Sequence, residues 1–276
     1  MKNPAVLESL TYQPGIRDGV LYHYTSADSL FEILGNLKFR CSSVKNLNDL
    51  YDFNVCNLDV PKDFYNLNKT KQNIKLLCFT KNYRQNGNIH RGTNLPRMWA
   101  QYADNNRGAC IAIDKHKFIQ ENSDVLKGLF YKIKQVRYTC QDFMISDIPV
   151  TGSCKNFNSK SYLEENHSQL FFSKHIDWRD EREVRFLGLD TPNFLSIKNS
   201  VKFISLGNRF CRDKELLNKL AFTIAQSEIL QKFYERRMFL FSVPTCHGYK
   251  DGDAASFIKE VADTSSQTLS FFKKEY

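Results

Sequence analysis

The apolar residues of this chain occur in many short runs, and this distribution most limits the folds that the chain can adopt. Polar stretches rich in Asn, Lys and Ser separate the runs, and none approaches the roughly 18 apolar residues of a membrane-spanning helix. Short apolar segments bounded by turn residues predict strands. Because helical patterns lie between them without regular alternation, we expect an α+β fold with a mixed, largely antiparallel sheet.

Seven strands and three helices are expected. The predicted strands cover 19–24, 37–41, 74–80, 109–113, 182–189, 201–206 and 238–243. The first helix should open at Thr25 or Ser26, where Thr25 and Asp28 have capping-box spacing, and should close at Gly35 in a left-handed conformation. A second helix is expected over 95–104, with Pro96 in its first turn, and a third over 213–224.

The polar stretches at 61–75, 81–94 and 150–161 are interpreted as loops inserted in one domain. That domain is expected over 20–247, after an N-terminal extension (1–19) and before a C-terminal helical tail (248–276).

Composition and motifs exclude several classes of protein. Lys and Arg number 39 against 30 Asp and Glu, a net charge of +9 that suits an anionic partner.

The eight cysteines form no CxxC pair, and Cys78 and Cys110 lie in apolar runs, which favours free thiols in a reducing cytoplasm. The first residues lack the apolar stretch of a signal sequence, so a cytoplasmic protein without a membrane partner is expected. The chain has no HExxH, zinc-finger, P-loop, GxGxxG or GxSxG motif, so no metal is expected and the sequence does not support the common ATPase, dehydrogenase or serine-hydrolase sites.

One carboxylate is predicted in an unusual place. In a strand beginning near Arg182, alternation puts Glu183 and Arg185 on the same face as two leucines, and Val184 and Phe186 on the other. A charge on an apolar face is costly unless it is paired or used. Glu183 is therefore a candidate site residue, with a salt-bridged strand edge as the alternative.

Five parts of the sequence form a recognisable series of motifs: Leu21–Ser26, Phe39–Ser43 with Leu47–Asp49, Cys78–Thr80, Met98–Asp104 and Trp178–Arg185. Together they resemble a bacterial family of unknown function that is often encoded near phage-defence and toxin genes. The resemblance covers about 21–245. Relatives usually carry proline after the Asn-Asp pair, whereas Leu50 stands there in this chain.

The order of a His-Thr strand, a central tyrosine and a glutamate at the start of a later strand is similar to the His-Tyr-Glu pattern of ADP-ribosyltransferases. This resemblance implies a sheet split into two halves around a cleft that binds NAD. It implies that Glu183 is the catalytic carboxylate, with Glu181 as an assistant, and that Tyr102 stacks on nicotinamide. The residues implied to bind NAD are His23 and Thr25 at the adenosine ribose, Arg40 at the pyrophosphate, and Asp49.

The resemblance implies a toxin or anti-phage defence effector that transfers ADP-ribose from NAD to a macromolecule, with an antitoxin or regulatory protein as a candidate partner. The net charge of +9 favours RNA or DNA over protein as the acceptor. An aromatic and basic rim including Tyr83, Phe118, Phe130 and Tyr131 would suit a single strand of nucleic acid. Two alternatives stay open, namely a non-catalytic sensor or interaction module and an NAD hydrolase. His23 as a structural histidine and Tyr102 as a core residue are the corresponding structural alternatives.

Overall fold

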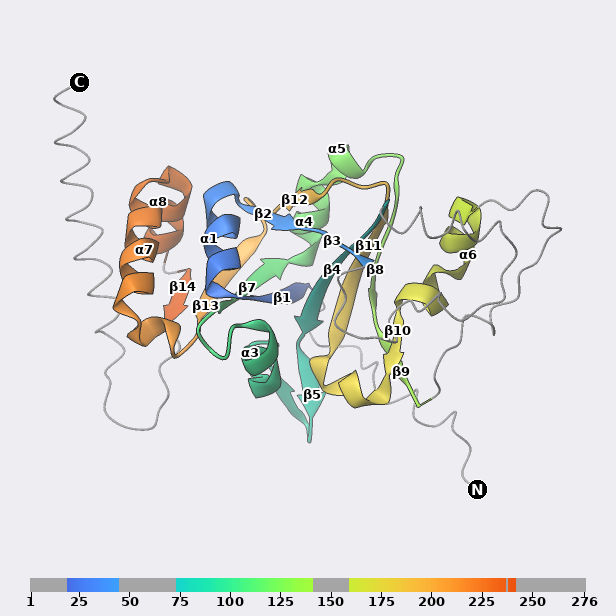
Figure 1. Ribbon diagram of the computed structural model, residues 1–276, viewed down its shortest axis with the longest axis horizontal. Helices are drawn as coiled ribbons and strands as arrows, with labels where there is room; N and C mark the ends of the chain where they lie inside the picture. The colour runs from blue at the N-terminus through green and yellow to red at the C-terminus, as the bar shows by residue number, and fades with distance from the viewer. Residues whose placement is uncertain (1–18, 45–72, 141–158, 237, 242–276) are drawn as a thin grey trace.

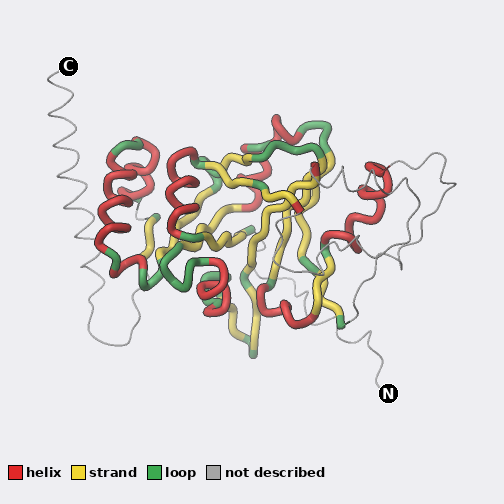
Figure 2. The backbone as a smooth tube through the Cα atoms, in the orientation of Figure 1, coloured by secondary structure: helices red, strands yellow, loops and turns green. Residues whose placement is uncertain are grey.

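A computed structural model describes residues 19–44, 73–140, 159–236 and 238–241. In these ranges an eight-stranded sheet runs through the molecule, with helices on both of its faces (Figures 1 and 2). Its order is β14 (Phe239–Phe241), β13 (Val201–Leu206), β7 (Ala109–Asp114), β1 (Val20–Thr25), β4 (Ile74–Lys81), β11 (Glu183–Leu189) and β8 (Phe130–Gln135), with β3 (Ser42–Ser43) beside β4. All of these pairs are antiparallel except β13–β14, so the predicted mixed, largely antiparallel sheet is confirmed.

Three two-stranded sheets accompany the large one. They are β2 (Lys38–Arg40) with β12 (Phe194–Ser196), β5 (Tyr83–Gln85) with β6 (Asn88–His90), and β9 (Arg137–Thr139) with β10 (Ser173–His175). The helices are α1 (Ala27–Asn36), α3 (Pro96–Tyr102), α4 (Lys115–Glu121), α5 (Ser123–Leu126), α6 (Ser159–Phe171), α7 (Lys214–Ala225) and α8 (Glu228–Glu235), with 3₁₀ turns η7 (Ile176–Glu181) and η8 (Phe210–Arg212). Within these residues no helix is long and apolar enough to cross a membrane.

Local signals in the sequence explain most element boundaries, with two corrections. Helix α1 begins after Ser26, whose hydroxyl accepts a hydrogen bond from the Ser29 N–H, as expected for an N-cap. Gly35 does not close this helix. Leu37 takes the left-handed position, with φ 50°, and donates its N–H to the Ile33 carbonyl. The polar stretch 81–94 was also predicted as a loop and instead contains the β5–β6 hairpin, which turns at Asn86 and Gly87.

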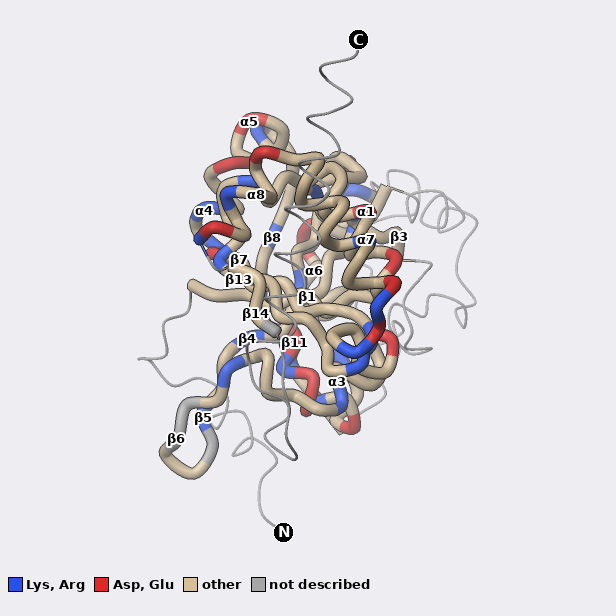
Figure 3. The backbone as a smooth tube through the Cα atoms, turned by 90° about the vertical axis from the view of Figure 1, so that its left-hand side faces the viewer, with Lys and Arg blue, Asp and Glu red and all other residues tan. Residues whose placement is uncertain are grey.

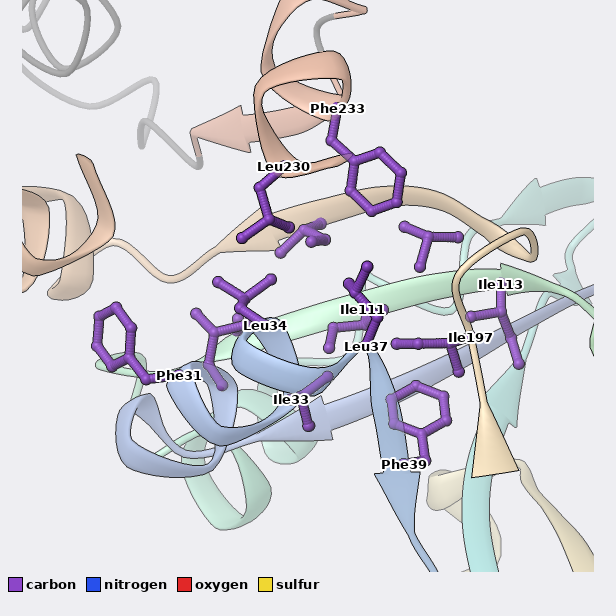
Figure 4. Close-up of a cluster of buried hydrophobic side chains, with 14 of the residues drawn as sticks. Phe31, Ile33, Leu34, Leu37, Phe39, Ile111, Ile113, Ile197, Leu230 and Phe233 are labelled. Carbon is purple, nitrogen blue, oxygen red and sulfur yellow. The ribbon is translucent and has the colours of Figure 1, made fainter. Parts of the chain in front are cut away.

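The core lies on both faces of the sheet, because β4 and β11 are buried on both sides. Val184 and Phe186 face the larger cluster, which packs against α1, α4, α7 and α8 and is shown in part in Figure 4. Leu187 and Leu189 face a second cluster that includes residues of α6. The alternation predicted for β11 is therefore confirmed. Phe118 is 1% exposed inside the larger cluster, so its predicted place in a nucleic-acid rim was wrong.

Strands β1 and β4 stay paired only briefly. Their register contains Leu21 opposite Lys81 and Tyr22 opposite Thr80, whereas β1 pairs with β7 along its whole length. Beyond Tyr22 the two central strands diverge. The sheet is continuous at this point, and a division into two halves of the ADP-ribosyltransferase kind remains a prediction. The boundaries expected at 19/20 and 247/248 also remain predictions, and the expected tail lies outside the described residues.

Candidate functional site

A cavity of about 190 Å³ lies at the divergence of β1 and β4. Five of the seven residues proposed from the sequence line it, namely His23, Arg40, Tyr102, Glu181 and Glu183. They come from β1, β2, α3, η7 and β11, which are far apart in the sequence. Thr25 is buried at the end of β1, opposite Ala109, and is not among the residues that line the cavity. Asp49 lies outside the described residues.

Four buried charges form a connected cluster in the wall of this cavity. The Arg185 guanidinium donates to both oxygens of Glu183, with Nε 2.7 Å from Oε1 and Nη2 3.0 Å from Oε2. The Lys174 ammonium lies 2.7 Å from Glu181 Oε2 and 3.4 Å from Glu183 Oε2. Arg185 also donates to the Phe171 carbonyl at 3.0 Å. Two cations and two carboxylates balance one another, which is the condition under which buried charges are tolerated.

The cluster keeps Glu183 ionised. Burial alone would raise the pKa of this carboxyl group, but the charges of Arg185 and Lys174 outweigh that effect and bring the pKa of Glu183 to about 2. Burial would lower the pKa of Lys174, and the two carboxylates raise it instead. Burial and the neighbouring Glu183 raise the pKa of the Cys78 thiol well above its usual value. At neutral pH the site therefore contains a fixed carboxylate beside a neutral thiol.

Helix α3 brings Tyr102 to this cluster. Pro96 occupies its first turn, as predicted, and the Tyr102 hydroxyl donates to Glu181 Oε1 at 2.7 Å. The helix stops in a left-handed turn formed by three consecutive residues, Asp104, Asn105 and Asn106, with φ of 47°, 54° and 68°. Gly108 then passes so close to β1 that a Cβ at this position would clash with the Thr25 carbonyl. The end of α3 is therefore fixed against the strand that borders the cavity.

Arg182 sets the direction of the two carboxylates. It adopts a left-handed conformation, with φ 52°, between η7 and β11, and its N–H donates to the Arg179 carbonyl. Both Glu181 and Glu183 then face the cavity, one from the last residue of η7 and the other from the first residue of β11. The predicted strand start at Arg182 is thus one residue early, because this residue closes the turn.

His23 approaches the cavity from the other face of the sheet. Its neighbour Tyr22 pairs with Thr80, which pairs with Glu183, so alternation directs the His23 side chain away from Glu183. The imidazole packs 4.6 Å from the Phe39 ring, and Nδ1–H donates to the Cys78 carbonyl at 3.0 Å. Burial lowers the pKa of His23, so the ring is neutral at pH 7. These contacts are those of a structural histidine that also borders the cavity.

Sequence reasoning missed Lys174 and left Arg185 without a role. Arg185 could have been found, because it follows Glu183 by two residues on the same face of one strand. Lys174 lies in a three-residue strand that pairs with β9 in a separate two-stranded sheet, and no periodic pattern marks it. Cys78 was predicted only as a packing residue, yet it lines the cavity next to Glu183. Within the described ranges, no three His, Cys, Asp or Glu side chains are grouped to hold a metal ion.

The segment that carries most of this cluster is also the part of the chain that resembles a known family. Residues 98–186 match the family described as protein of unknown function (DUF2971). The match covers about a third of the chain and includes Tyr102 and the four buried charges, but not His23 or Arg40. No curated protein and no solved structure matches the chain. Because the DUF2971 description gives no activity, a function has to be argued from the chemistry of the cavity.

Proposed function

We propose that the cavity binds the nicotinamide end of NAD and that the protein transfers ADP-ribose from NAD to a macromolecule. The observation that carries this proposal is the charge of the lining. The four buried charges cancel, and in the described part of the chain Arg40 is the one charged residue of the lining without an ionic partner. An exposed guanidinium beside a neutral cavity favours a ligand with an anionic group outside and, inside, a flat group that is uncharged or whose single charge is spread over a ring.

The size of the cavity agrees with one end of a dinucleotide. Pockets that enclose a whole drug-sized ligand usually measure about 300 to 1,000 Å³, whereas this cavity measures about 190 Å³. We therefore assign the nicotinamide and part of its ribose to the cavity, next to Tyr102. The pyrophosphate then lies at Arg40, whose planar guanidinium can bind two phosphate oxygens at once.

The reaction that this placement supports is cleavage of the bond between C1′ of the nicotinamide ribose and the ring nitrogen. The electron pair of that bond stays on the nicotinamide nitrogen, which becomes neutral, and positive charge develops at C1′ and the ring oxygen. An ionised Glu183 stabilises this charge, which exists only in the transition state. A nucleophilic atom of the acceptor then bonds to C1′ and gives up its proton to solvent water.

The neighbours of Glu183 determine how it can act. Arg185 donates hydrogen bonds to both oxygens of the carboxylate and Lys174 donates to one of them, so the carboxylate is held in one orientation. The Cys78 thiol is a weak donor to the same carboxylate. It is the partner that a ribose hydroxyl would displace without breaking an ion pair.

A non-catalytic binding module is the second candidate, and the same cluster favours it. Glu181 accepts hydrogen bonds from Tyr102 and Lys174, and Glu183 accepts them from Arg185 and Lys174, so all four charges have partners without a ligand. A satisfied, neutral cluster can serve as a rigid wall that recognises NAD or another nucleotide and performs no reaction.

The decisive experiment uses NAD with a radioactive phosphate in its ADP-ribose part and measures which molecules become labelled. The protein is incubated with this NAD and with RNA, DNA or cell lysate, next to Glu183→Gln and the double variant Glu183→Gln/Lys174→Met. The double variant lacks Glu183 but keeps the cluster neutral, so it separates loss of catalysis from loss of folding. We expect labelled polymer with the unchanged protein and at least about 100-fold less with both variants.

Other outcomes identify the alternatives. Release of nicotinamide without labelled polymer would mean NAD hydrolysis, with water as the acceptor. Binding of NAD in a calorimeter, without either product, would mean a binding module. Full activity in the folded double variant would remove Glu183 from the site, and an Arg40→Ala variant that binds NAD as tightly as the unchanged protein would remove the proposed pyrophosphate contact.

A further inference from the structure

A second feature of the same region is an exposed surface on which arginines lie against aromatic rings. Four arginines along the β5–β6 hairpin, α3 and η7 are exposed or partly exposed: Arg91 directly after β6, Arg97 on α3, Arg179 on η7 and Arg182 directly after η7. We call this surface the arginine face. Asp177 and Asp180 are the exposed acidic residues of η7 beside it, so the face keeps a net positive charge. Figure 3 shows basic positions around α3.

Two of these arginines cover aromatic rings. The Arg97 guanidinium lies 5.1 Å from the centre of the Trp178 ring, and its Nη1 donates to the Asp177 carbonyl at 3.1 Å. The Arg182 guanidinium lies 5.0 Å from the centre of the Tyr83 ring. Flat guanidinium groups held in this way offer a charged surface on which a nucleobase can stack. Phosphates can reach the other arginines at the same time.

Imidazole and indole rings extend the stacking surface. Tyr83 stacks on His90 with ring centres 4.9 Å apart and an angle of 14° between the planes. The buried Lys174 ammonium also lies 4.6 Å from the centre of the Trp178 ring. Trp178 therefore connects the arginine face to the charge cluster of the cavity. Arg182 separates Glu181 from Glu183 in the chain, which places the face directly beside the two carboxylates.

We propose that the arginine face binds the acceptor of the transferred group, and that this acceptor is a single strand of nucleic acid. The inference rests on the proposed function, since it names the substrate that meets ADP-ribose at Glu183. Single strands fit better than duplexes because their bases are free to stack on arginine and aromatic planes while the backbone meets positive charge. An acidic protein would use the charges of the face but not its stacked planes.

Binding of a fluorescein-labelled single strand of about 20 nucleotides, measured by anisotropy without NAD, tests this inference on the full chain. The Arg91→Gln/Arg179→Gln variant removes two exposed charges outside the cavity lining. We expect its affinity to fall at least about tenfold, and the slope of log affinity against log salt to become shallower by about 1.4. The matched control Lys117→Gln/Lys127→Gln removes the same charge from exposed positions around α4 and α5 and should change affinity less than about twofold.

The stacking part of the proposal has its own variant. Arg97→Lys keeps the charge but loses the planar group over Trp178, and we expect it to weaken binding at least about fivefold. Three results would overturn the inference. They are equal losses of affinity in the arginine double variant and the lysine double variant, unchanged affinity in Arg97→Lys, and equal affinity of the unchanged protein for a single strand and for a duplex of the same length. NAD label that appears on protein and never on the oligonucleotide would also overturn it. Because the binding measurement contains no NAD, its failure leaves the proposed NAD chemistry intact, and loss of that chemistry leaves the binding result intact.

Discussion

Glu183 and Lys174 show how strongly single residues of the cavity depend on one another. Both side chains are less than a tenth exposed, and each carries a charge whose partner is equally buried. Replacing Glu183 by Gln leaves Lys174 and Arg185 with Glu181 alone, so one buried positive charge is uncompensated. Breaking a buried ion pair in this way costs about 3 to 5 kcal/mol. We expect Glu183→Gln to lower the free energy of unfolding in urea by that amount.

The double variant Glu183→Gln/Lys174→Met is the matched control for this prediction. It keeps one carboxylate and one guanidinium, so the charges again balance, and we expect it to regain part of the lost stability. A double variant less stable than Glu183→Gln would show that Lys174 stabilises the fold by packing against Trp178 rather than by its charge.

The ionised state of Glu183 also predicts an acid-sensitive stability. The pKa of this group is about 2 in the folded protein, against a usual value of 4.5. A carboxyl group whose pKa is lower in the folded than in the unfolded protein stabilises the fold when it is ionised. This contribution is complete at pH values above the usual pKa and disappears as the pH falls toward the pKa of the folded protein. We therefore expect the stability difference between the protein and Glu183→Gln to shrink as the pH falls from about 4.5 toward 2, by about 3 kcal/mol in total. Urea unfolding of both proteins at a series of pH values measures it, and a constant difference would contradict the assigned pKa.

Among the elements, the left-handed turn after α3 gives the clearest prediction. Asn105 is exposed in this turn and has φ 54°, a conformation that Asn and Gly accept more readily than Ala. Asn105→Ala should lower the free energy of unfolding by about 1 kcal/mol, which corresponds to about 2 to 4 °C in Tm. Asn105→Gly also removes the amide but tolerates the conformation, so we expect it to keep the Tm of the unchanged protein within about 1 °C or to raise it. Equal Tm values for the two variants would show that the conformation of this turn carries no strain.

Sequence patterns predicted those elements whose signals are local. Strand β4, strand β7 and helix α7 have apolar runs or caps inside their own segments, and all three are found where they are expected. Strand β10 and helix α6 were not predicted. The three residues of β10 owe their structure to pairing with β9, and the apolar residues of α6 form two pairs, 162–163 and 170–171, separated by a polar run, so they show no helical period. Such elements are specified by partners distant in the sequence, which a local pattern cannot show.

The candidate site illustrates the same limit at the scale of the whole molecule. Glu183 could be singled out because a charge interrupted an apolar face, and in the structure it lines the cavity. The pairing of Glu183 with Lys174 could not be predicted, because β10 pairs with β9 and no strand pairing joins it to β11. The opposite orientation of His23 could not either, since it depends on the register between β1 and β4. The residue types of the site could be predicted from the sequence, whereas the faces toward which their side chains point depend on the register of the sheet.

The central strands β4 and β11 also join the two apolar clusters into one structure, and this predicts how the described part of the molecule unfolds. Phe186 and Leu187 are neighbours on β11, both fully buried, and they face opposite clusters. Truncating either to Ala should lower the free energy of unfolding by about 2 to 5 kcal/mol. Because β11 cannot lose one face without exposing the other, we expect each variant to unfold in a single transition.

Two probes follow this transition in different places. Far-UV circular dichroism reports the whole backbone, and tryptophan fluorescence reports Trp99 in the cluster beneath α3 and Trp178 beside the buried charges. In both Phe186→Ala and Leu187→Ala the two curves should coincide and shift together. A fluorescence transition at lower urea than the backbone transition in Leu187→Ala alone would mean that the face carrying α6 and the cavity unfolds separately. The sheet would then be two cooperative layers rather than one.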